Sequence, residues 1–275
     1  MAGKGTVITR HHSDAIYRIE NAAKRAGYIA LEHYCNRLAD HIIAPSKAVL
    51  GVLVERQGVA RFKVSLIPYP QDARRFEVPQ EQVSCVREEL GMRRRTDLVC
   101  VSRLHPEKGH RYLFQALAAL KRDGMEFSLY LVGEGALRDS LQWMARELDI
   151  ADNVHFLGWR DDALAIVAAA DVVVHPSLQE ALPSAIIEAM ALQKPIVATD
   201  VSGIRDIVDQ YGSIVPPADV AAFQAALRRA VGNLDAARSL AARGRARLLQ
   251  YMDASRVARE YVQCYRKVMG SRPQA

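Results

Sequence analysis

Residues 171–200, DVVVHPSLQEALPSAIIEAMALQKPIVATD, contain two apolar runs separated by a stretch with helical character. The runs 171–177 and 195–200 are continuous rather than alternating, which is typical of strands buried on both faces of a parallel sheet. The helix between them is predicted to begin near Pro183, because proline is preorganised for a first helical turn. A strand, helix and strand in this order indicate a parallel sheet with helices on its faces.

The same alternation continues on both sides of this stretch. Further strands are predicted at 98–104, 127–133, 154–159 and, more weakly, 213–217. Helices are predicted between them at 109–122, 136–148, 163–170 and 204–208. The pattern therefore predicts a doubly wound, Rossmann-like α/β domain over residues 96–252, with its ligand crevice at the carboxyl ends of the strands.

The amino-terminal part of the chain predicts a smaller α/β segment over residues 1–70. Its expected strands are 6–10, 41–46 and 63–68, and its expected helices are 22–40 and 47–57. Three strands are few for a free-standing domain of this type. Residues 71–95 have no strand character and are predicted to be a linker with one short helix at 83–90. The last segment, 253–275, is predicted to form an amphipathic helix that packs back toward the amino-terminal segment.

Composition narrows the class of protein. The net charge of +6 favours anionic partners, whereas 7% aromatic residues and no basic run longer than Arg93 to Arg95 argue against nucleic acid. No apolar run approaches the roughly 18 residues of a membrane span. The amino terminus lacks the apolar core of a secretory signal, which predicts a cytoplasmic protein. The four cysteines are far apart and fit a reducing compartment without a zinc site.

Two carboxylates, Glu180 and Glu188, flank the predicted start of the helix. The amides from Leu182 to Ala185, together with the positive end of the helix dipole, predict an anion site suited to a diphosphate. Glu188 is the one charged residue between Ala185 and Leu192. It needs a partner that offsets its desolvation, and the residues leave ligand hydroxyls and a structural ion pair evenly balanced.

A second group of candidates follows the strand at 98–104. Arg103 and Lys108, in SRLHPEKG, suit a pyrophosphate because arginine offers two donors and lysine a mobile charge. Solvated surface charges are the alternative. Gly133 and Gly135 do not complete a dinucleotide fingerprint, because Arg138 stands where the third glycine belongs.

The strand at 154–159 ends in Gly158, Trp159 and Arg160. Trp159 suits stacking on a base, but packing is the commoner role of a tryptophan at a strand end. Asp161 is predicted to be a helix N-cap rather than a metal ligand, and no D-x-D motif supports a bridging metal ion. His105 and His110 are expected at the surface.

These motifs together resemble the carboxyl-terminal domain of retaining glycosyltransferases of the GT-B architecture, in the large family 4 group. The resemblance covers residues 97 to about 233 and lies in SRLHPEKG, LVGEG, FLGW, HPSLQEALPSAIIEAMALQKPIVATDVSG and GSIVPPAD. The family signature E-x7-E is met by Glu180 and Glu188. The segment from RLADHIIAPSKAV to KVSLIP is similar to the last third of that family's amino-terminal domain. The expected fold is thus GT-B-like, with a complete carboxyl-terminal domain and a partial, acceptor-side amino-terminal domain that lacks its first strands.

The resemblance implies a role for each matching residue. Arg103 and Lys108 would neutralise the donor diphosphate, Glu180 would bind the donor sugar, and Glu188 would hold the ribose. The implied donor-binding set is completed by Leu182, Pro183, Ser184 and Ala185 at the phosphates, Gly158, Trp159 and Arg160 near the base, and Gly133. Two positions stand apart. Ala181 occupies a site that is usually glycine in the family, and His12, or His11, resembles a histidine of the family's cleft, although polar surface explains it equally well.

Two functions from different classes follow. The first is a retaining glycosyltransferase that moves a sugar from a nucleotide diphosphate sugar, without metal or other cofactor, to an acceptor sugar or lipid-linked glycan in envelope or polysaccharide biosynthesis. The second is a non-catalytic or partner-dependent nucleotide-sugar-binding module; an epimerase is disfavoured by E-x7-E. The incomplete amino-terminal sheet predicts self-association or a partner subunit. The basic residues Lys24, Arg25 and Arg37 are compatible with an anionic membrane surface, and a solvated helix face is the simpler interpretation.

Overall fold

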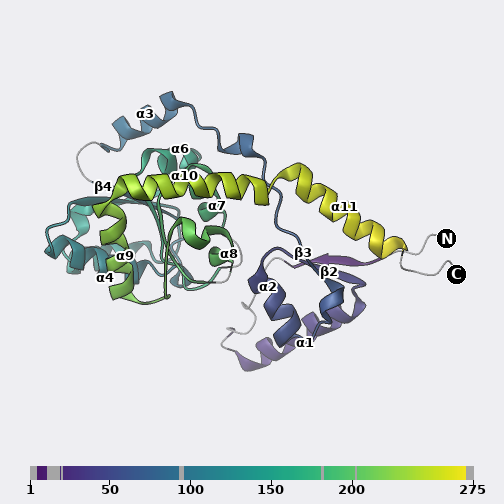
Figure 1. Ribbon diagram of the computed structural model, residues 1–275. Coiled ribbons are helices and arrows are strands. Elements are labelled where there is room, and N and C mark those ends of the chain that lie inside the picture. The colour runs from purple at the N-terminus through teal and green to yellow at the C-terminus, as the bar shows by residue number, and fades with distance from the viewer. Residues whose placement is uncertain are drawn as a thin grey trace. The chain divides into compact units, whose positions relative to one another are not determined.

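The computed structural model describes residues 5–10, 19, 21–92, 96–180, 183–201 and 203–270 (Figure 1). The chain divides into two compact units. The first comprises Met1–Asp72, Glu180–Leu182 and Gln250–Ala275, and the second comprises Ala73–Gln179 and Pro183–Leu249. No helix of the described residues is both long enough and apolar enough to cross a membrane.

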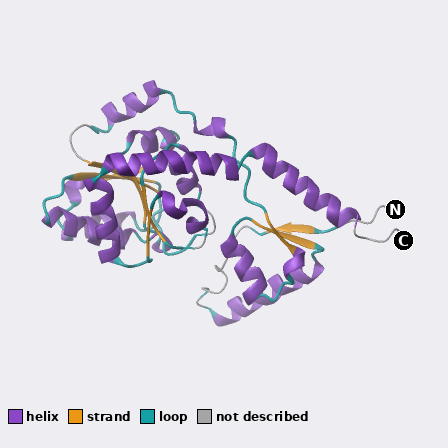
Figure 2. Cartoon of the chain, in the orientation of Figure 1, coloured by secondary structure: helices purple, strands orange, loops and turns teal. Residues whose placement is uncertain are grey.

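The second unit is built on a six-stranded parallel sheet with the order β6-β5-β4-β7-β8-β9. Figure 2 shows its strands in orange among purple helices. Its strands are β4 (Thr96–Val101), β5 (Phe127–Val132), β6 (Val154–Gly158), β7 (Val172–His175), β8 (Ile196–Thr199) and β9 (Ser213–Val215). All six strands were predicted. The chain runs outward in opposite directions from β4 and β7, so these two neighbours form the topological switch point, where ligands of doubly wound sheets bind.

Helices cover both faces of this sheet. They are α3 (Gln80–Glu89), α4 (His110–Arg122), α5 (Arg138–Glu147), α6 (Ala163–Ala169), α7 (Ser184–Ala191), α8 (Ile204–Val208), α9 (Val220–Gly232) and α10 (Leu234–Tyr251). Helix α4 packs beside α5 and α9, whereas α6 packs beside α3 and α7. On β4, Leu98 and Cys100 join the core under α4, and the intervening Val99 is fully buried as well. The inner strands β5, β4, β7 and β8 are largely apolar because neither of their faces meets water.

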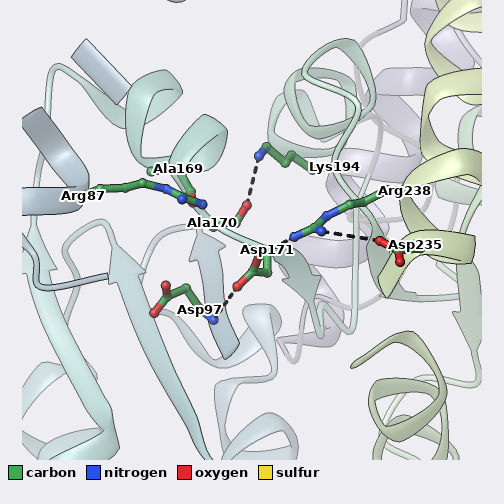
Figure 3. Close-up of polar contacts among 8 residues, drawn as sticks. All are labelled: Arg87, Asp97, Ala169, Ala170, Asp171, Lys194, Asp235 and Arg238. Carbon is green, nitrogen blue, oxygen red and sulfur yellow. Dashed lines mark hydrogen bonds and ion pairs between the residues drawn. The ribbon is translucent and has the colours of Figure 1, made fainter. Parts of the chain in front are cut away.

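A group of charged residues, the amino-edge cluster, gathers where the strands begin (Figure 3). It consists of Arg87, Asp97, Asp171, Lys194 and Arg238. Arg87 of α3 donates from Nε and Nη2 to the carbonyl of Ala169 at 3.1 and 2.8 Å, and Lys194 Nζ donates to the carbonyl of Ala170 at 2.9 Å. These carbonyls end α6, where cations are favoured by the helix dipole.

The contacts of α3 change how the predicted linker is understood. Residues 71–95 were expected to join two domains, yet α3 packs on α6 and is held there by Arg87. The division between the units accordingly falls after Asp72. The helix itself begins at Gln80, before the predicted start. A side chain that reaches a carbonyl 82 residues away leaves no local signal in the sequence.

The carboxylates of the amino-edge cluster tie β4 to β7. Asp171 Oδ2 accepts from the backbone N–H of Asp97 at 3.1 Å, and Asp171 Oδ1 accepts from Arg238 of α10 at 2.7 Å. Burial and the nearby Asp171 raise the pKa of Asp97 to about 6. The contacts of Asp171 therefore join β4, α10 and the start of β7, but they keep two carboxylates close together.

The first unit contains a three-stranded parallel sheet with the order β1-β2-β3. Its elements are β1 (Val7–Thr9), α1 (Ala22–Leu38), β2 (His41–Ala44), α2 (Lys47–Gly51), β3 (Val64–Leu66) and α11 (Ala254–Gly270). Ile42 and Ala44 pack in one core cluster with residues of α2, and Ile43 packs in another with Val257 and Cys264 of α11. Alternate residues of β2 thus serve opposite faces of the sheet.

A buried polar ring fixes the inner face of α1. Arg10 forms an ion pair with Glu32 and donates to Asn36 Oδ1 at 2.6 Å. Asn36 donates to Gln57 Oε1 at 2.7 Å, and Gln57 donates back to Glu32. Gln57 follows the single π-helical turn Val52–Arg56 that continues α2. The ring makes the orientation of α1 about its own axis specific, because rotation would leave buried polar groups unpaired.

Candidate functional site

The loop after β4 carries both predicted phosphate ligands. Arg103 follows the strand, and Lys108 ends the short 3-10 helix Pro106–Lys108. The side chain of Arg103 is 73% exposed, and its Nη2 donates to Glu107 Oε1 at 2.7 Å. Lys108 is half-buried. Both cations therefore lie on one loop at the switch point, as the sequence predicted, although Arg103 lies largely in solvent.

The loops after β4 and β7 are fastened to each other through their backbones. The N–H of Leu178 donates to the carbonyl of Glu107 at 2.7 Å. Gly109 has a φ of 65°, and a Cβ at this residue would lie 2.1 Å from the carbonyl oxygen of Pro176. The Thr199 hydroxyl of β8 donates to the carbonyl of Ser177. The loop that leads to the half-buried Glu180 is thereby anchored on both sides.

Two histidines near these loops, His110 and His175, are buried. His110, the first residue of α4, is 2% exposed, and its Nε2 lies 3.0 Å from Ser102 Oγ. Burial, with smaller effects from His175 and Lys108, lowers the pKa of His110 to about 4, so the ring is neutral at physiological pH. The prediction that His110 lies at the surface was wrong. The missed signal was helical spacing, since His110 shares a face with Leu113, Phe114 and Leu117.

Helix α7 begins within one residue of its predicted start. Pro183 is its N-cap, with an extended backbone, and Ser184 is its first helical residue. The amides of Ile186 and Ile187 both donate to the carbonyl of Pro183. The geometry of a helix start leaves the amides of Ser184 and Ala185 without acceptors inside the helix. They are the described part of the predicted phosphate-binding group, and Leu182 and Ala181 lie outside the described residues.

Glu188 occupies the middle of α7 and is half-buried. Burial raises the pKa of its carboxyl, and Arg75 in the 3-10 helix Ala73–Phe76 acts in the opposite direction. Within the described part of the chain, Glu188 makes no hydrogen bond or ion pair. The structural ion pair that the sequence left open is therefore absent among these residues, and the desolvation of Glu188 is only partly offset.

Glycines let the loops after β5 and β6 approach the β4 loop closely. Gly133 has a φ of 136°, and a Cβ there would lie 2.1 Å from the carbonyl oxygen of Ser102. Its N–H donates to the carbonyl of Gly158 at 2.8 Å. Arg138, which replaces the third glycine of a dinucleotide fingerprint, donates to the carbonyl of Phe156 at 3.3 Å. The predicted donor-binding residues Gly133 and Gly158 thus form adjoining parts of one sheet edge.

The loop after β6 contains two residues whose roles the sequence left to be decided. Trp159 is 77% exposed, which disagrees with packing, the commoner of the two roles weighed for it, and leaves stacking on a base as the other. Its Nε1 donates to Asp161 Oδ1 at 3.2 Å. Asp161 is not the N-cap of α6, because that position belongs to Asp162. A largely exposed indole ring therefore follows β6 at the carboxyl edge of the sheet.

The side chain of Arg160 is held by protein carboxylates. It donates to both oxygens of Glu89 in α3, at 2.6 and 3.0 Å, and to both oxygens of Asp162, at 2.8 and 2.7 Å. These hydrogen bonds lower the pKa of Glu89 and of Asp162. Arg160 fixes the loop on α3. Because its guanidinium is held by these carboxylates, the backbone of Arg160 is the part considered for ligand binding.

Two further predictions bear on the site. His11 and His12 lie outside the described residues. Among the residues that the structure describes, no group of three or more histidine, cysteine, aspartate or glutamate side chains is arranged to hold a metal ion.

The chain is similar to known proteins both in sequence and in structure. A family model described as "Glycosyl transferases group 1" matches residues 95–233. The 2-deoxystreptamine glucosyltransferase of Streptomyces kanamyceticus is 28% identical over 224 residues, which are 78% of this chain and 57% of the relative. The UDP-Gal:alpha-D-GlcNAc-diphosphoundecaprenol alpha-1,3-galactosyltransferase of Escherichia coli is 25% identical over 83% of this chain and 61% of its own length. The chain therefore spans less than two thirds of these relatives.

Solved structures show the same fold. Anabaena HepE in complex with UDP has a TM-score of 0.87 and 22% identity, covering 96% of this chain and 72% of HepE. The sucrose-phosphate synthase of Thermosynechococcus elongatus has a TM-score of 0.81 and 26% identity, covering 97% of this chain and 68% of the synthase. The predicted α/β fold of the GT-B type is confirmed.

Proposed function

The chain belongs to the glycosyl transferases group 1 family, and we propose that it is a retaining glycosyltransferase of the family 4 type. Its donor is a nucleotide diphosphate sugar bound at the carboxyl ends of β4 and β7. This position agrees with the general rule that doubly wound sheets bind ligands at the switch point. The cytoplasmic location expected from the sequence belongs to the same proposal.

The diphosphate is bound by two kinds of donor. Arg103 and Lys108 supply positive charge, and the amides of Ser184 and Ala185 point from the start of α7. As the bond from sugar to diphosphate breaks, negative charge grows on the leaving nucleotide. Preorganised cations stabilise that charge more than they stabilise the intact donor, which lowers the barrier. The proposed reaction therefore uses protein cations in the role that a metal ion plays elsewhere.

Glu188 carries the proposal. It is a half-buried carboxylate on an otherwise apolar helix, and within the described residues it has no hydrogen-bond partner. A ribose offers two hydroxyl donors, which would offset the desolvation that raises the pKa of Glu188. Glu180, eight positions earlier on the anchored β7 loop, binds the donor sugar in this proposal.

The exposed Trp159 and the backbone of Gly158 and Arg160 are proposed to meet the base. The acceptor is proposed to be a sugar or a lipid-linked glycan, as the names of the two curated relatives suggest for those proteins. The step is written as displacement of nucleoside diphosphate by an acceptor hydroxyl on the same face of the donor sugar, with the hydroxyl proton leaving to the diphosphate or to water.

Calorimetry with UDP, GDP and their sugars tests the donor assignment. Glu188→Ala is expected to weaken nucleotide affinity about 10- to 100-fold, the range for a lost hydrogen bond to a charged group. Glu126→Ala, which removes an exposed carboxylate just before β5, is the matched control and is expected to bind as the parent does. Equal affinity of the Glu188→Ala variant and its parent would remove the ribose assignment.

A second substitution separates binding from transfer. Glu180→Gln is expected to abolish most sugar transfer while nucleoside diphosphate affinity stays within about twofold, because the sugar is absent from that ligand. Equal loss of both would contradict the division of roles between Glu180 and Glu188. Nucleotide binding by the parent without transfer to any acceptor would favour the binding-module alternative.

A further inference from the structure

A buried hydrogen bond closes the base of the loop that carries Arg103 and Lys108. Ser102 directly follows β4, and His110 is the first residue of α4. The Ser102 Oγ lies 3.0 Å from the His110 Nε2. The bond therefore joins the residue before Arg103 to the second residue after Lys108. We refer to the residues between its ends, 103–109, as the β4 loop.

The middle of the β4 loop is held through its backbone. The N–H of Leu104 donates to the carbonyl of Glu134 in the loop after β5 at 2.9 Å. The carbonyl of Glu107 accepts from the N–H of Leu178 in the loop after β7 at 2.7 Å. These contacts fasten the loop to its neighbours on both sides, whereas the buried hydrogen bond ties its two ends to each other.

Packing alone does not account for a histidine at the start of α4. The residue is 2% exposed, and its Nδ1 makes no hydrogen bond within the part of the chain that the structure describes. A buried polar atom without a partner lowers stability, and an apolar side chain would fill this position without that cost. Burial lowers the pKa of His110 to about 4, so the ring is neutral at physiological pH, and either tautomer can bond the Ser102 hydroxyl. What the ring adds to an apolar side chain is thus the bond to Ser102.

We infer that His110 is a positioning residue of the donor site, whose hydrogen bond to Ser102 holds Arg103 and Lys108 where a diphosphate binds. The inference rests on the proposed function, because only that assignment makes the two cations phosphate ligands. The Arg103 side chain is 73% exposed, so the position of its backbone decides where its guanidinium can reach. A loop that is ordered before the ligand arrives loses less conformational entropy on binding. In this role His110 acts through the loop and does not contact the ligand.

Nucleotide binding by the full chain tests this role. The probes are whichever of UDP and GDP the parent binds more tightly, measured by calorimetry, and the corresponding nucleoside, measured by competition. His110→Leu and Ser102→Ala are each expected to weaken diphosphate binding about 5- to 10-fold. Nucleoside affinity is expected to stay within about twofold, because a nucleoside has no phosphate for the β4 loop to bind. A role in overall folding would not separate the two probes.

Three further variants serve as controls. The double variant Ser102→Ala/His110→Leu is expected to bind as the single variants do, since all of them lack the same bond. His110→Gln keeps an amide nitrogen near the place of Nε2 and is expected to bind the diphosphate within about twofold of the parent. Leu113→Met alters another fully buried residue of α4 and is expected to keep the parent affinity for both probes.

Three results would overturn the role of His110. They are parent affinity for the diphosphate in His110→Leu, equal weakening of diphosphate and nucleoside binding, and losses that add in the double variant. Arg103→Ala separates these results from failure of the donor assignment. If Arg103→Ala weakens diphosphate binding and His110→Leu does not, the donor assignment stands without the role of His110. Absence of diphosphate binding in the parent, or unchanged binding in Arg103→Ala, would contradict the donor assignment and this role together.

Discussion

The two edges of the six-stranded sheet use charge in opposite ways. At the amino edge, Arg87, Lys194 and Arg238 reach carbonyl or carboxylate oxygens on other elements, and the contacts fasten helices to the sheet (Figure 3). At the carboxyl edge, Arg103 pairs with Glu107 on its own loop and Glu188 is half-buried with its carboxyl pKa raised. The charges of the amino edge hold elements of the fold together, whereas the carboxyl edge also contains Glu188, whose desolvation the described residues do not fully offset.

The same contrast appears in the backbone. At the carboxyl edge, the β4 and β7 loops are held by glycine and carbonyl contacts, such as Gly109 against Pro176, whereas the loop after β6 is held by the ion pair of Arg160 with Glu89. These contacts hold the backbones of the two loops in place. Loops held in this way, next to a half-buried carboxylate such as Glu188 that has no partner among the described residues, suit a ligand site, and natural proteins accept the cost in stability.

Substitution of Gly109 is expected to have the largest effect on stability. In Gly109→Ala, the new Cβ would meet the Pro176 carbonyl oxygen at 2.1 Å, so the β4 and β7 loops must separate. We expect the free energy of unfolding to fall by about 3 kcal/mol or more, as for other severe backbone clashes. Gly91→Ala is the matched control, since Gly91 has a φ of 67° and nothing within 4 Å of a Cβ. It is expected to cost about 1 kcal/mol. The measurement is urea unfolding. Equal losses of stability in Gly109→Ala and Gly91→Ala would mean that the β4 and β7 loops are not packed closely against each other.

Removal of a charge from the amino edge is expected to lower the free energy of unfolding somewhat less than Gly109→Ala does. In Asp171→Asn, the amide nitrogen faces either Arg238 or the N–H of Asp97, so one of two hydrogen bonds becomes a contact between donors. We expect a loss of about 2 kcal/mol in the free energy of unfolding. Asp235→Asn alters the other carboxylate near Arg238, at 3.8 Å and 98% exposed, and is expected to change stability by less than about 0.5 kcal/mol. A neutral Asp171→Asn variant would show that the amino-edge cluster does not fasten the helices.

The strands and helices could be predicted because their signals are local. Runs such as residues 98–101 of β4 are apolar at every position, which is typical of a parallel strand covered on both faces. The switch point then follows from the order of elements, and it brings Arg103, Lys108 and the start of α7 to one edge. That much of the candidate site was predictable from the sequence, while the roles of these residues stay predictions.

The misplaced residues have non-local causes. Arg160 meets Glu89 across 71 positions, and Leu178 meets Glu107 through the backbone, whose contacts leave no trace in residue type. His110 was placed at the surface because histidine is polar, although its helical spacing pointed inward. For Trp159, packing was weighed as the commoner role because tryptophan at a strand end is usually packed, although the residue is largely exposed. For these two residues the average preference of the residue type outweighed its position.

A pH-dependent effect distinguishes the two carboxylates of the amino edge. The pKa of Asp97 is raised from 3.8 to about 6 by burial and by Asp171, so the folded protein binds a proton that the unfolded chain has lost between about pH 4 and 6. The contribution of Asp97 to the free energy of unfolding therefore falls as the pH rises from about 4 to about 6. Asp97→Asn removes the fall and keeps an acceptor for Tyr130, which lies 3.4 Å from Asp97 Oδ1.

The Asp97→Asn variant is accordingly expected to be as stable as its parent below pH 4 and about 1 to 2 kcal/mol more stable above pH 7. The whole pKa shift corresponds to about 3 kcal/mol, and the amide of the variant offsets part of this because it accepts the Tyr130 hydrogen bond less strongly than a carboxylate does. Urea unfolding across this pH range is the measurement. A constant difference at all pH values would mean that the substitution acts through packing and not through the proton. Asp171→Asn, by contrast, is expected to lower stability above pH 7, so two neighbouring carboxylates would respond with opposite signs.

Glu188→Gln is expected to give the smallest change in stability. It is also the most direct test of the difference between the two edges of the sheet. Glu188 is desolvated without an ion pair in the described residues, so the neutral amide is expected to raise the free energy of unfolding by up to about 1 kcal/mol near pH 7. The raised pKa makes this gain disappear as the pH falls and the native carboxyl binds a proton. The same variant is expected to bind nucleotide more weakly, because an amide oxygen accepts hydroxyl hydrogen bonds less strongly than a carboxylate does. A chain that becomes more stable while it binds less would identify Glu188 as a group retained for its ligand. Lower stability in Glu188→Gln would instead place it with Asp171 among the residues that hold the fold together.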